Sequence, residues 1–171
     1  VPRISRAQSL DVLSSMSNVS GYRGIIEAAE AYAGMFGGQV TAAGSTPPAR
    51  VFVIGAGVAG LAALGAAGSL GATVRAYDVR SDVAEQIESM GATYVSVDAA
   101  AQESADGYAS ALSDEQEAAT KRVYAAESAA ADVVVTTALI RGKAPVTITA
   151  EMVAAMRPGS VIVDLAASGG G

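Results

Sequence analysis

Three residue types are missing from this 171-residue sequence: cysteine, histidine and tryptophan. Without cysteine there can be no disulfide bond, thiolate nucleophile or cysteine-ligated metal, and we predict no metal site. The lack of histidine excludes more. A dehydrogenase that oxidises an alcohol, a hydroxy acid or an amino acid moves a proton together with the hydride, and histidine is the usual proton carrier. Either the acid–base groups lie outside this chain, or its chemistry needs none.

Basic residues are also scarce. Lysine occurs only at Lys121 and Lys143, the net charge is −6, and no basic cluster is present, so we expect no binding to nucleic acid. Apolar residues make up 51% of the chain and aromatic residues 5%, which predicts one compact unit with a core of Ala, Val, Leu and Ile. The chain opens on Val1, not Met, and leads at once into polar sequence. We therefore expect no signal peptide, and we expect the chain to be part of a longer protein.

A glycine motif follows the apolar run VFVI at positions 51–54. Gly55, Gly57 and Gly60 form the pattern G-x-G-x-x-G at the point where a strand would turn into a helix. The first glycine suits the tight turn, the second leaves room for a pyrophosphate beside bare backbone, and the third lets the helix pack closely on the sheet. Free N–H groups at the start of that helix would bind the phosphates.

An acidic residue completes the motif. A second apolar run, Thr73 to Tyr77, ends in Asp78, about twenty residues after the glycines. A carboxylate there would accept hydrogen bonds from the hydroxyls of the adenosine ribose and would repel a 2′-phosphate. The pattern therefore predicts NAD(H), and not NADP(H), as the nucleotide. Direct hydride transfer between two nicotinamide rings would need no proton carrier, which agrees with the missing histidine.

A membrane span is the main alternative for this region, because every residue between Arg50 and Arg75 is uncharged and the run is long enough to cross a bilayer. Six glycines interrupt the run, however, and its β-branched residues cluster at the two ends. A buried strand-helix-strand unit has this pattern.

Strands and helices are predicted to alternate along the whole chain, which indicates an α/β Rossmann-type fold: a doubly wound parallel sheet in the order 3-2-1-4-5, preceded by an amino-terminal linking helix. Capping boxes are predicted at Ser5/Gln8, Asp82/Glu85 and Ser113/Gln116. The predicted helices cover about 5–34, 58–70, 81–90, 113–130 and a segment from about 149, and the predicted strands cover 39–43, 51–54, 73–77, 93–97, 133–135 and 160–165. Residues 98–106 are predicted to form a surface loop.

Binding residues are expected at the carboxyl edge of this sheet, where the strand order reverses. The candidate cofactor-binding residues at this edge are Gly55, Ala56, Gly57, Val58, Gly60, Asp78, Val79, Arg80, Thr136, Thr137, Ala138 and Leu139.

The amino-terminal segment PRISRAQSLDVLSS places Gln8, Asp11 and Ser14 at three-residue steps, along one side of the predicted helix start, with Arg3 within pairing range of Asp11. An ordinary structural explanation fits as well: Ser5 and Gln8 cap the helix, Asp11 and Ser14 are polar first-turn residues, and Arg3 is solvated. Spacing alone does not decide between the two.

Taken together, PRISRAQSLDVLSSMSNVSGYR, TAAGSTPPARVFVIGAGVAGLAA, DGYA, VVVTTALI and RPGSVIVDLA resemble the NAD(H)-binding component of the proton-translocating nicotinamide nucleotide transhydrogenases, from its linking helix through most of its second subdomain. The resemblance covers nearly the whole chain. Alanine dehydrogenases share the fold and the glycine motif but lack this similarity at R-x-x-x-x-Q-x-x-D. By this resemblance the chain comprises a nicotinamide loop and linking helix at 1–34, a hairpin or arm at 37–49 and a Rossmann core at 50–165.

The resemblance implies roles for four catalytic candidates. Arg3 would bond the carboxamide of the nicotinamide, and Gln8 would lie where an NADP(H)-binding domain docks. Asp11 and Ser14 would fix Arg3 and the orientation of the ring. Gly107, Tyr108 and Ala109 match a mobile loop that folds over bound nucleotide in the family.

The implied enzyme is a proton-translocating NAD(P)+ transhydrogenase, with NADP(H) on a partner domain, a membrane proton-channel domain and a homodimeric parent. The domain would lie on the cytoplasmic face of the plasma membrane, or on the matrix side of a mitochondrial membrane. One departure is Arg141-Gly142-Lys143-Ala144-Pro145, where the family usually has proline directly after TTALI. Two alternatives stay open: an amino-acid dehydrogenase of the alanine dehydrogenase type with its acid–base residues elsewhere, and a module that binds NAD(H) without chemistry.

Overall fold

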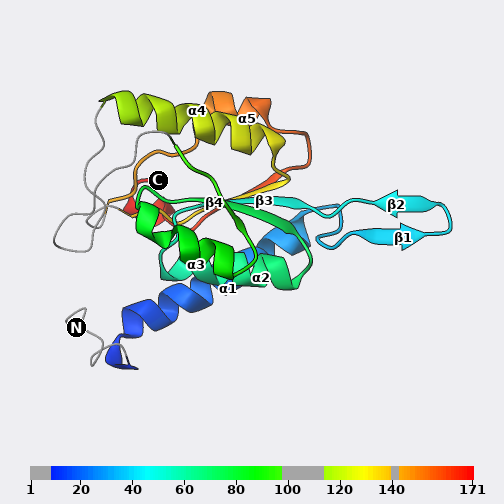
Figure 1. Ribbon diagram of the computed structural model, residues 1–171, viewed down its shortest axis with the longest axis horizontal. Helices are drawn as coiled ribbons and strands as arrows, with labels where there is room; N and C mark the ends of the chain where they lie inside the picture. The colour runs from blue at the N-terminus through cyan, green and yellow to red at the C-terminus, as the bar shows by residue number, and fades with distance from the viewer. Residues whose placement is uncertain (1–8, 98–113, 140–142) are drawn as a thin grey trace.

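A parallel sheet of five strands, in the order β5-β4-β3-β6-β7, lies at the centre of the computed structural model, which describes residues 9–97, 114–139 and 143–171 (Figure 1). In chain order the sheet reads 3-2-1-4-5, so the predicted doubly wound fold is confirmed. The strands are β3 (Arg50–Ile54), β4 (Thr73–Tyr77), β5 (Thr93–Tyr94), β6 (Val133–Thr136) and β7 (Val161–Asp164).

Helices cover both faces of the sheet (Figure 1). On one face lie α1 (Val12–Ala31), α2 (Val58–Ser69) and α3 (Ala84–Ser89), and on the other lie α4 (Asp114–Ala130) and α5 (Ala150–Ala155). Strand β3 supplies both cores, because successive side chains of a strand point to opposite faces. Val51 and Val53 pack in the cluster that includes Leu64 of α2, whereas Phe52 and Ile54 pack in the cluster that includes Tyr124 of α4.

The uncharged run between Arg50 and Arg75 divides into β3, α2 and β4, as the strand-helix-strand interpretation predicted. Helix α2 has 12 residues. Across the described ranges, no helix combines the length and the apolar character needed to cross a membrane.

Helix α1 packs against the start of α2 through a glycine. A Cβ atom added at Gly21 would lie 2.0 Å from the carbonyl oxygen of Ala59, so only glycine allows the two backbones to approach this closely. The prediction that α1 begins at Ser5 is wrong: Asp11 is its N-cap and Val12 its first residue. The carboxylate of Asp11 accepts a hydrogen bond from the backbone N–H of Ser14, and such a cap defines the end of a helix.

A two-stranded antiparallel hairpin, β1 (Gln39–Thr41) and β2 (Gly44–Thr46), extends away from the sheet (Figure 1). The prediction for residues 37–49 left a hairpin and an extended arm open, and the structure has the hairpin. The predicted strand 39–43 is too long, because Thr41 and Gly44 are already paired across the turn. The side chain of Val40 is 88% exposed.

Other predicted details also differ from the structure. Asp82 and Glu85 do not form a capping box: Asp82 lies inside the 3-10 turn η2 (Ser81–Val83), which leads into α3 without a side-chain cap. Strand β5 ends at Tyr94, although Val95 still donates a backbone hydrogen bond to Ala76. Another 3-10 turn, η3 (Ala167–Gly169), follows β7. The predicted boxes at Ser5/Gln8 and Ser113/Gln116, and the loop 98–106, lie outside the described residues.

Candidate functional site

The glycine motif forms the turn between β3 and α2, and two of its glycines are required by the fold itself. Gly55 has a φ of +96°, a conformation that side chains disfavour, and a Cβ there would lie 2.7 Å from Thr137 Oγ1. At Gly60 an added Cβ would lie 1.8 Å from the carbonyl oxygen of Gly55. Helix α2 therefore starts in direct backbone contact with the end of β3.

Gly57 is different, because a Cβ at this position would meet no atom within 4 Å. Nothing in the packing of the described residues explains a glycine here, whereas a ligand that approaches the backbone would. Gly57 is also the N-cap of α2 and supplies no side-chain cap. The first N–H groups of the helix are therefore left for an external acceptor, at the end where the helix dipole favours negative charge.

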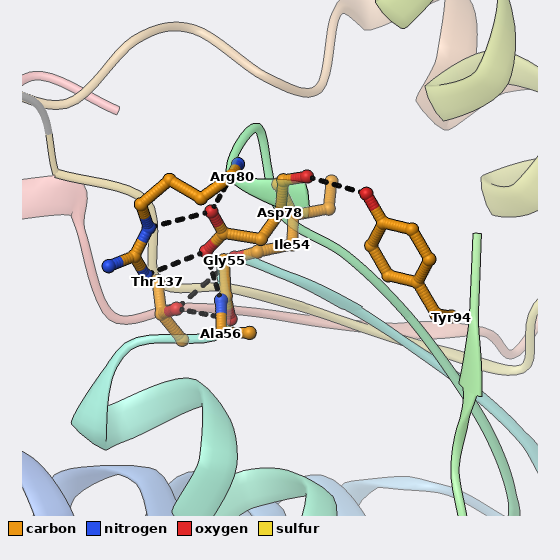
Figure 2. Close-up of polar contacts among 7 residues, drawn as sticks. All are labelled: Ile54, Gly55, Ala56, Asp78, Arg80, Tyr94 and Thr137. Carbon is orange, nitrogen blue, oxygen red and sulfur yellow. Dashed lines mark hydrogen bonds and ion pairs between the residues drawn. The ribbon is translucent and has the colours of Figure 1, made fainter. Parts of the chain in front are cut away.

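Asp78, directly after β4, closes this turn (Figure 2). Its Oδ2 accepts a hydrogen bond of 2.7 Å from the backbone N–H of Ala56, and its Oδ1 accepts one of 2.9 Å from the backbone N–H of Arg80. Only 7% of Asp78 is exposed. A carboxylate predicted to face a ribose thus also holds the glycine turn against the neighbouring strand.

The guanidinium of Arg80 pairs with the same carboxylate. Nε donates to Oδ1 at 3.0 Å and a terminal nitrogen donates to Oδ2 at 3.2 Å, so the ion pair is bidentate (Figure 2). Among the candidate residues, Asp78 and Arg80 are therefore the two that carry opposite charges in direct contact at this edge.

Thr137 ties the end of β6 to the same turn. Its hydroxyl lies 3.2 Å from the carbonyl oxygen of Ile54 and 3.0 Å from that of Gly55 (Figure 2). The backbone N–H of Thr137 donates to Ile54 as well, at 2.8 Å. The ends of β3, β4 and β6 thus converge, as the position of a switch point in a doubly wound sheet requires.

Two residues that were not among the predicted candidates also form hydrogen bonds at this edge of the sheet. Asp164, at the end of β7, accepts a hydrogen bond of 2.7 Å from the hydroxyl of Thr136. Tyr94 donates from its hydroxyl to the carbonyl oxygen of Asp78 at 3.4 Å, and burial, together with the nearby Tyr77 and Asp78, raises its pKa. Each lies at a strand end, and position after an apolar run was the available signal for Asp164.

The remaining candidates surround this centre. Val79 and Ala138 are partly buried against the core on the α4 side, and Val58 and Leu139 are 44% and 53% exposed. Arg3, Gln8 and Tyr108 lie outside the described residues. Among the residues that the structure describes, no three His, Cys, Asp or Glu residues come together as metal ligands would.

Asp11 and Ser14 lie together at the start of α1. The hydroxyl of Ser14 donates to Asp11 Oδ2 at 2.6 Å and its backbone N–H donates to Oδ1 at 3.2 Å. These two hydrogen bonds, the hydroxyl first, lower the pKa of the Asp11 carboxyl. Asp11 is thus the N-cap of α1, a role that the sequence analysis had not given it, and its carboxylate stays ionised at neutral pH.

Comparison with known proteins finds a matching family and several relatives. The family model described as the alanine dehydrogenase/PNT C-terminal domain matches residues 24–171. The chain is 58% identical to the NAD(P) transhydrogenase subunit alpha of Haemophilus influenzae, and the match covers 100% of this chain but 34% of that protein. An alanine dehydrogenase of Mycobacterium tuberculosis is 34% identical, over 95% of this chain and 40% of its own length.

Among solved structures, the transhydrogenase from Sinorhizobium meliloti superimposes with a TM-score of 0.85 at 46% identity, covering 99% of this chain and 45% of that one. This chain therefore spans less than half the length of the proteins that it matches.

Proposed function

This chain belongs to the alanine dehydrogenase/PNT C-terminal domain family, and we propose that it is the NAD(H)-binding domain of an NAD(P) transhydrogenase, which passes hydride from NADH to NADP+ bound on a separate domain. The observation that carries the proposal is the glycine turn itself. Space for a ligand is open beside Gly57, whereas Gly55 and Gly60 are in close contact with the rest of the fold. Asp78 accepts a hydrogen bond from the backbone of the same turn.

The residues present fit a dinucleotide. The pyrophosphate would lie against the backbone at Gly57 and the first N–H groups of α2, where the helix dipole favours a negative charge. The adenosine ribose would lie against Asp78, and the nicotinamide half would extend past Thr137 toward the amino-terminal segment. Arg3 would bond the carboxamide, Gln8 would face the NADP(H) domain, and Asp11 with Ser14 would orient Arg3.

The chemistry fits a chain without histidine. The nicotinamide supplies a hydride, and its transfer to a second nicotinamide moves no proton. The task of this chain is then to orient one ring and to exclude water around it. An amino-acid dehydrogenase would need an acid–base group outside this chain. The chain is 58% identical to the transhydrogenase subunit and 34% identical to the alanine dehydrogenase, which favours the transhydrogenase function.

We also propose the remaining parts of the parent assembly from this relationship. They are an NADP(H)-binding domain, a membrane domain that conducts protons, and a second copy of the subunit. Proton translocation would reside in those parts. The domain itself would lie on the cytoplasmic face of the plasma membrane or on the matrix side of a mitochondrial membrane.

The test replaces Gln8 by Asn in the protein that contains this chain, mixed with a transhydrogenase NADP(H) domain. Gln8→Asn keeps the amide and shortens its reach, so the fold should be retained, which circular dichroism checks. Displacement of reacting atoms by about 1 Å costs about a hundredfold in rate, so single-turnover hydride transfer from NADH to an NADP+ analogue should slow strongly. Parental transfer rates in this variant would show that Gln8 takes no part in hydride transfer.

Arg3→Ala provides the contrasting variant. We expect it to weaken NADH binding in an equilibrium titration, with Asp11→Asn giving a smaller effect in the same direction. Oxidation of L-alanine by the same protein would favour the alanine dehydrogenase alternative, and binding of NADH without any hydride transfer would favour a non-catalytic module.

A further inference from the structure

The carboxylate of Asp78 is fully engaged before any nucleotide arrives. A carboxylate offers about four lone-pair sites. Asp78 uses them for the backbone N–H groups of Ala56 and Arg80 and for two nitrogens of the Arg80 guanidinium (Figure 2). A ribose hydroxyl that donates to Asp78 must therefore displace one of these donors.

The guanidinium is the donor that can yield. The two backbone groups make the shorter bonds, 2.7 Å and 2.9 Å, and their positions are set by the glycine turn and by the start of η2. The guanidinium bonds are longer, at 3.0 Å and 3.2 Å, and the Arg80 side chain is 23% exposed against 8% for that of Asp78. Arg80 also sits at the end of a flexible stem, whereas Ala56 donates from the main chain.

A guanidinium displaced by a few ångströms stays beside the carboxylate, which is where the 2′ position of the adenosine ribose would lie. This argument rests on the nucleotide site proposed above. We propose that Arg80 is a dormant ligand for a 2′-phosphate, held out of that role by its ion pair with Asp78, so that the choice between NAD(H) and NADP(H) is made by the pair and not by the carboxylate alone.

The chemistry of the two groups supports this assignment. Guanidinium binds phosphate with two parallel N–H···O bonds, and in Rossmann sites that accept NADP(H) an arginine near the ribose takes the 2′-phosphate. In this chain Asp78 acts on a 2′-phosphate twice: its own charge repels the phosphate, and it occupies the two guanidinium nitrogens that would bind it.

The experiment measures the dissociation constants of NADH and NADPH by fluorescence titration for the 171-residue chain and four variants. Asp78→Ser removes the carboxylate and leaves a small hydroxyl, and Asp78→Ser/Arg80→Gln also removes the guanidinium. Arg80→Gln alone keeps Asp78 and the backbone bond of residue 80. Arg75→Gln is the matched control, because Arg75 also makes a bidentate ion pair, with Glu127, but in the exposed part of β4 away from the glycine turn.

We expect Asp78→Ser to raise the ratio of NADPH affinity to NADH affinity by about a hundredfold, and the added Arg80→Gln to remove at least about tenfold of that gain. Arg80→Gln alone should shift the ratio the other way, toward NADH. Arg75→Gln should leave the ratio as it is. If Asp78→Ser does not fold, as judged by circular dichroism, the opposite shift in Arg80→Gln still tests the proposal.

Two results would overturn it. An unchanged ratio in Arg80→Gln would show that the guanidinium takes no part in the choice, and a gain in Asp78→Ser that persists in the double variant would assign the choice to the carboxylate alone. Failure of the parental chain to bind either nucleotide would instead reject the proposed nucleotide site, so the two hypotheses fail separately.

Discussion

The main-chain N–H of Ala56 and the side chain of Asp78 are joined by a hydrogen bond of 2.7 Å, which connects the turn after β3 to the end of β4. The residue expected to select the nucleotide thus also shapes the turn expected to hold its phosphates. Substitution of Asp78 therefore changes two subsites at once, and variants at this position require a separate measure of folding.

Nucleotide preference follows from the charge at Asp78. We expect the unmodified chain to bind NADH at least about tenfold more tightly than NADPH, a difference of about 1.4 kcal/mol. Fluorescence titration of both nucleotides measures this directly. Equal affinities would show that Asp78 does not face the 2′ position of the ribose.

Access of the pyrophosphate to the backbone depends on Gly57. Gly57→Val places a branched side chain in the open space beside the start of α2, so NADH binding should be lost while the circular dichroism spectrum is retained. Gly68→Val is the control, because Gly68 lies near the far end of α2, the helix that Gly57 caps, and also has open space around its added Cβ. Undiminished NADH binding by Gly57→Val would place the pyrophosphate elsewhere.

The close approach of α2 to the glycine turn at Gly60 should matter for stability. Gly60→Ala forces a methyl group against the carbonyl oxygen of Gly55, 1.8 Å away in the unrelaxed structure, and should lower the free energy of unfolding by about 3 kcal/mol, the upper end of overpacking costs. Urea denaturation gives the value. Gly68→Ala, in open space on the same helix, should instead stabilise by about 0.5–1 kcal/mol, so a similar loss in both variants would disprove the contact.

The cap of α1 should depend on pH through Asp11. Hydrogen bonds from Ser14 lower the pKa of Asp11 below 3.8 in the folded chain, so the cap contributes stability above pH 3.8 and loses that contribution as the pH falls through the lowered value. Carboxyl-carbon NMR titration should show this pKa below 3.8 and should show it rising in Ser14→Ala. Ser15→Ala is the control, because the Ser15 hydroxyl donates to the backbone oxygen of Asp11 and not to its carboxylate. Equal shifts in the two serine variants would contradict the assignment.

The sequence was sufficient to predict the centre of the fold. Strand β4 has the predicted bounds, Thr73–Tyr77, because a short run with buried residues at alternate positions, between Gly71 and Asp78, has few other interpretations. The glycines at 55 and 60 were equally predictable, since the motif prescribes a positive φ and a close approach, and both are present.

Predictions of helix starts from local sequence patterns failed where more than one side chain could accept hydrogen bonds from the free backbone N–H groups. Asp82 and Glu85 match a capping box, but the chain makes a 3-10 turn there. Helix α1 begins at Val12 because Asp11 accepts a hydrogen bond from the backbone N–H of Ser14 and so caps it. The ion pair between Asp78 and Arg80 could not be predicted, because whether two neighbouring residues after a strand turn toward each other depends on the tertiary positions of β3 and η2.

The contact at Gly21 has a mechanical consequence. A Cβ at Gly21 would collide with Ala59, which lies in the first turn of α2. The backbones of α1 and α2 are therefore in close contact at this crossing, and a tilt of α1 about it would move the start of the helix. Asp11 lies ten residues away, so at 1.5 Å per residue the lever arm is about 15 Å, and a tilt of about 4° moves the helix start by about 1 Å. If phosphate binding shifted the first turn of α2, the same geometry would enlarge that shift at the start of α1, which in the sequence follows Arg3 and Gln8.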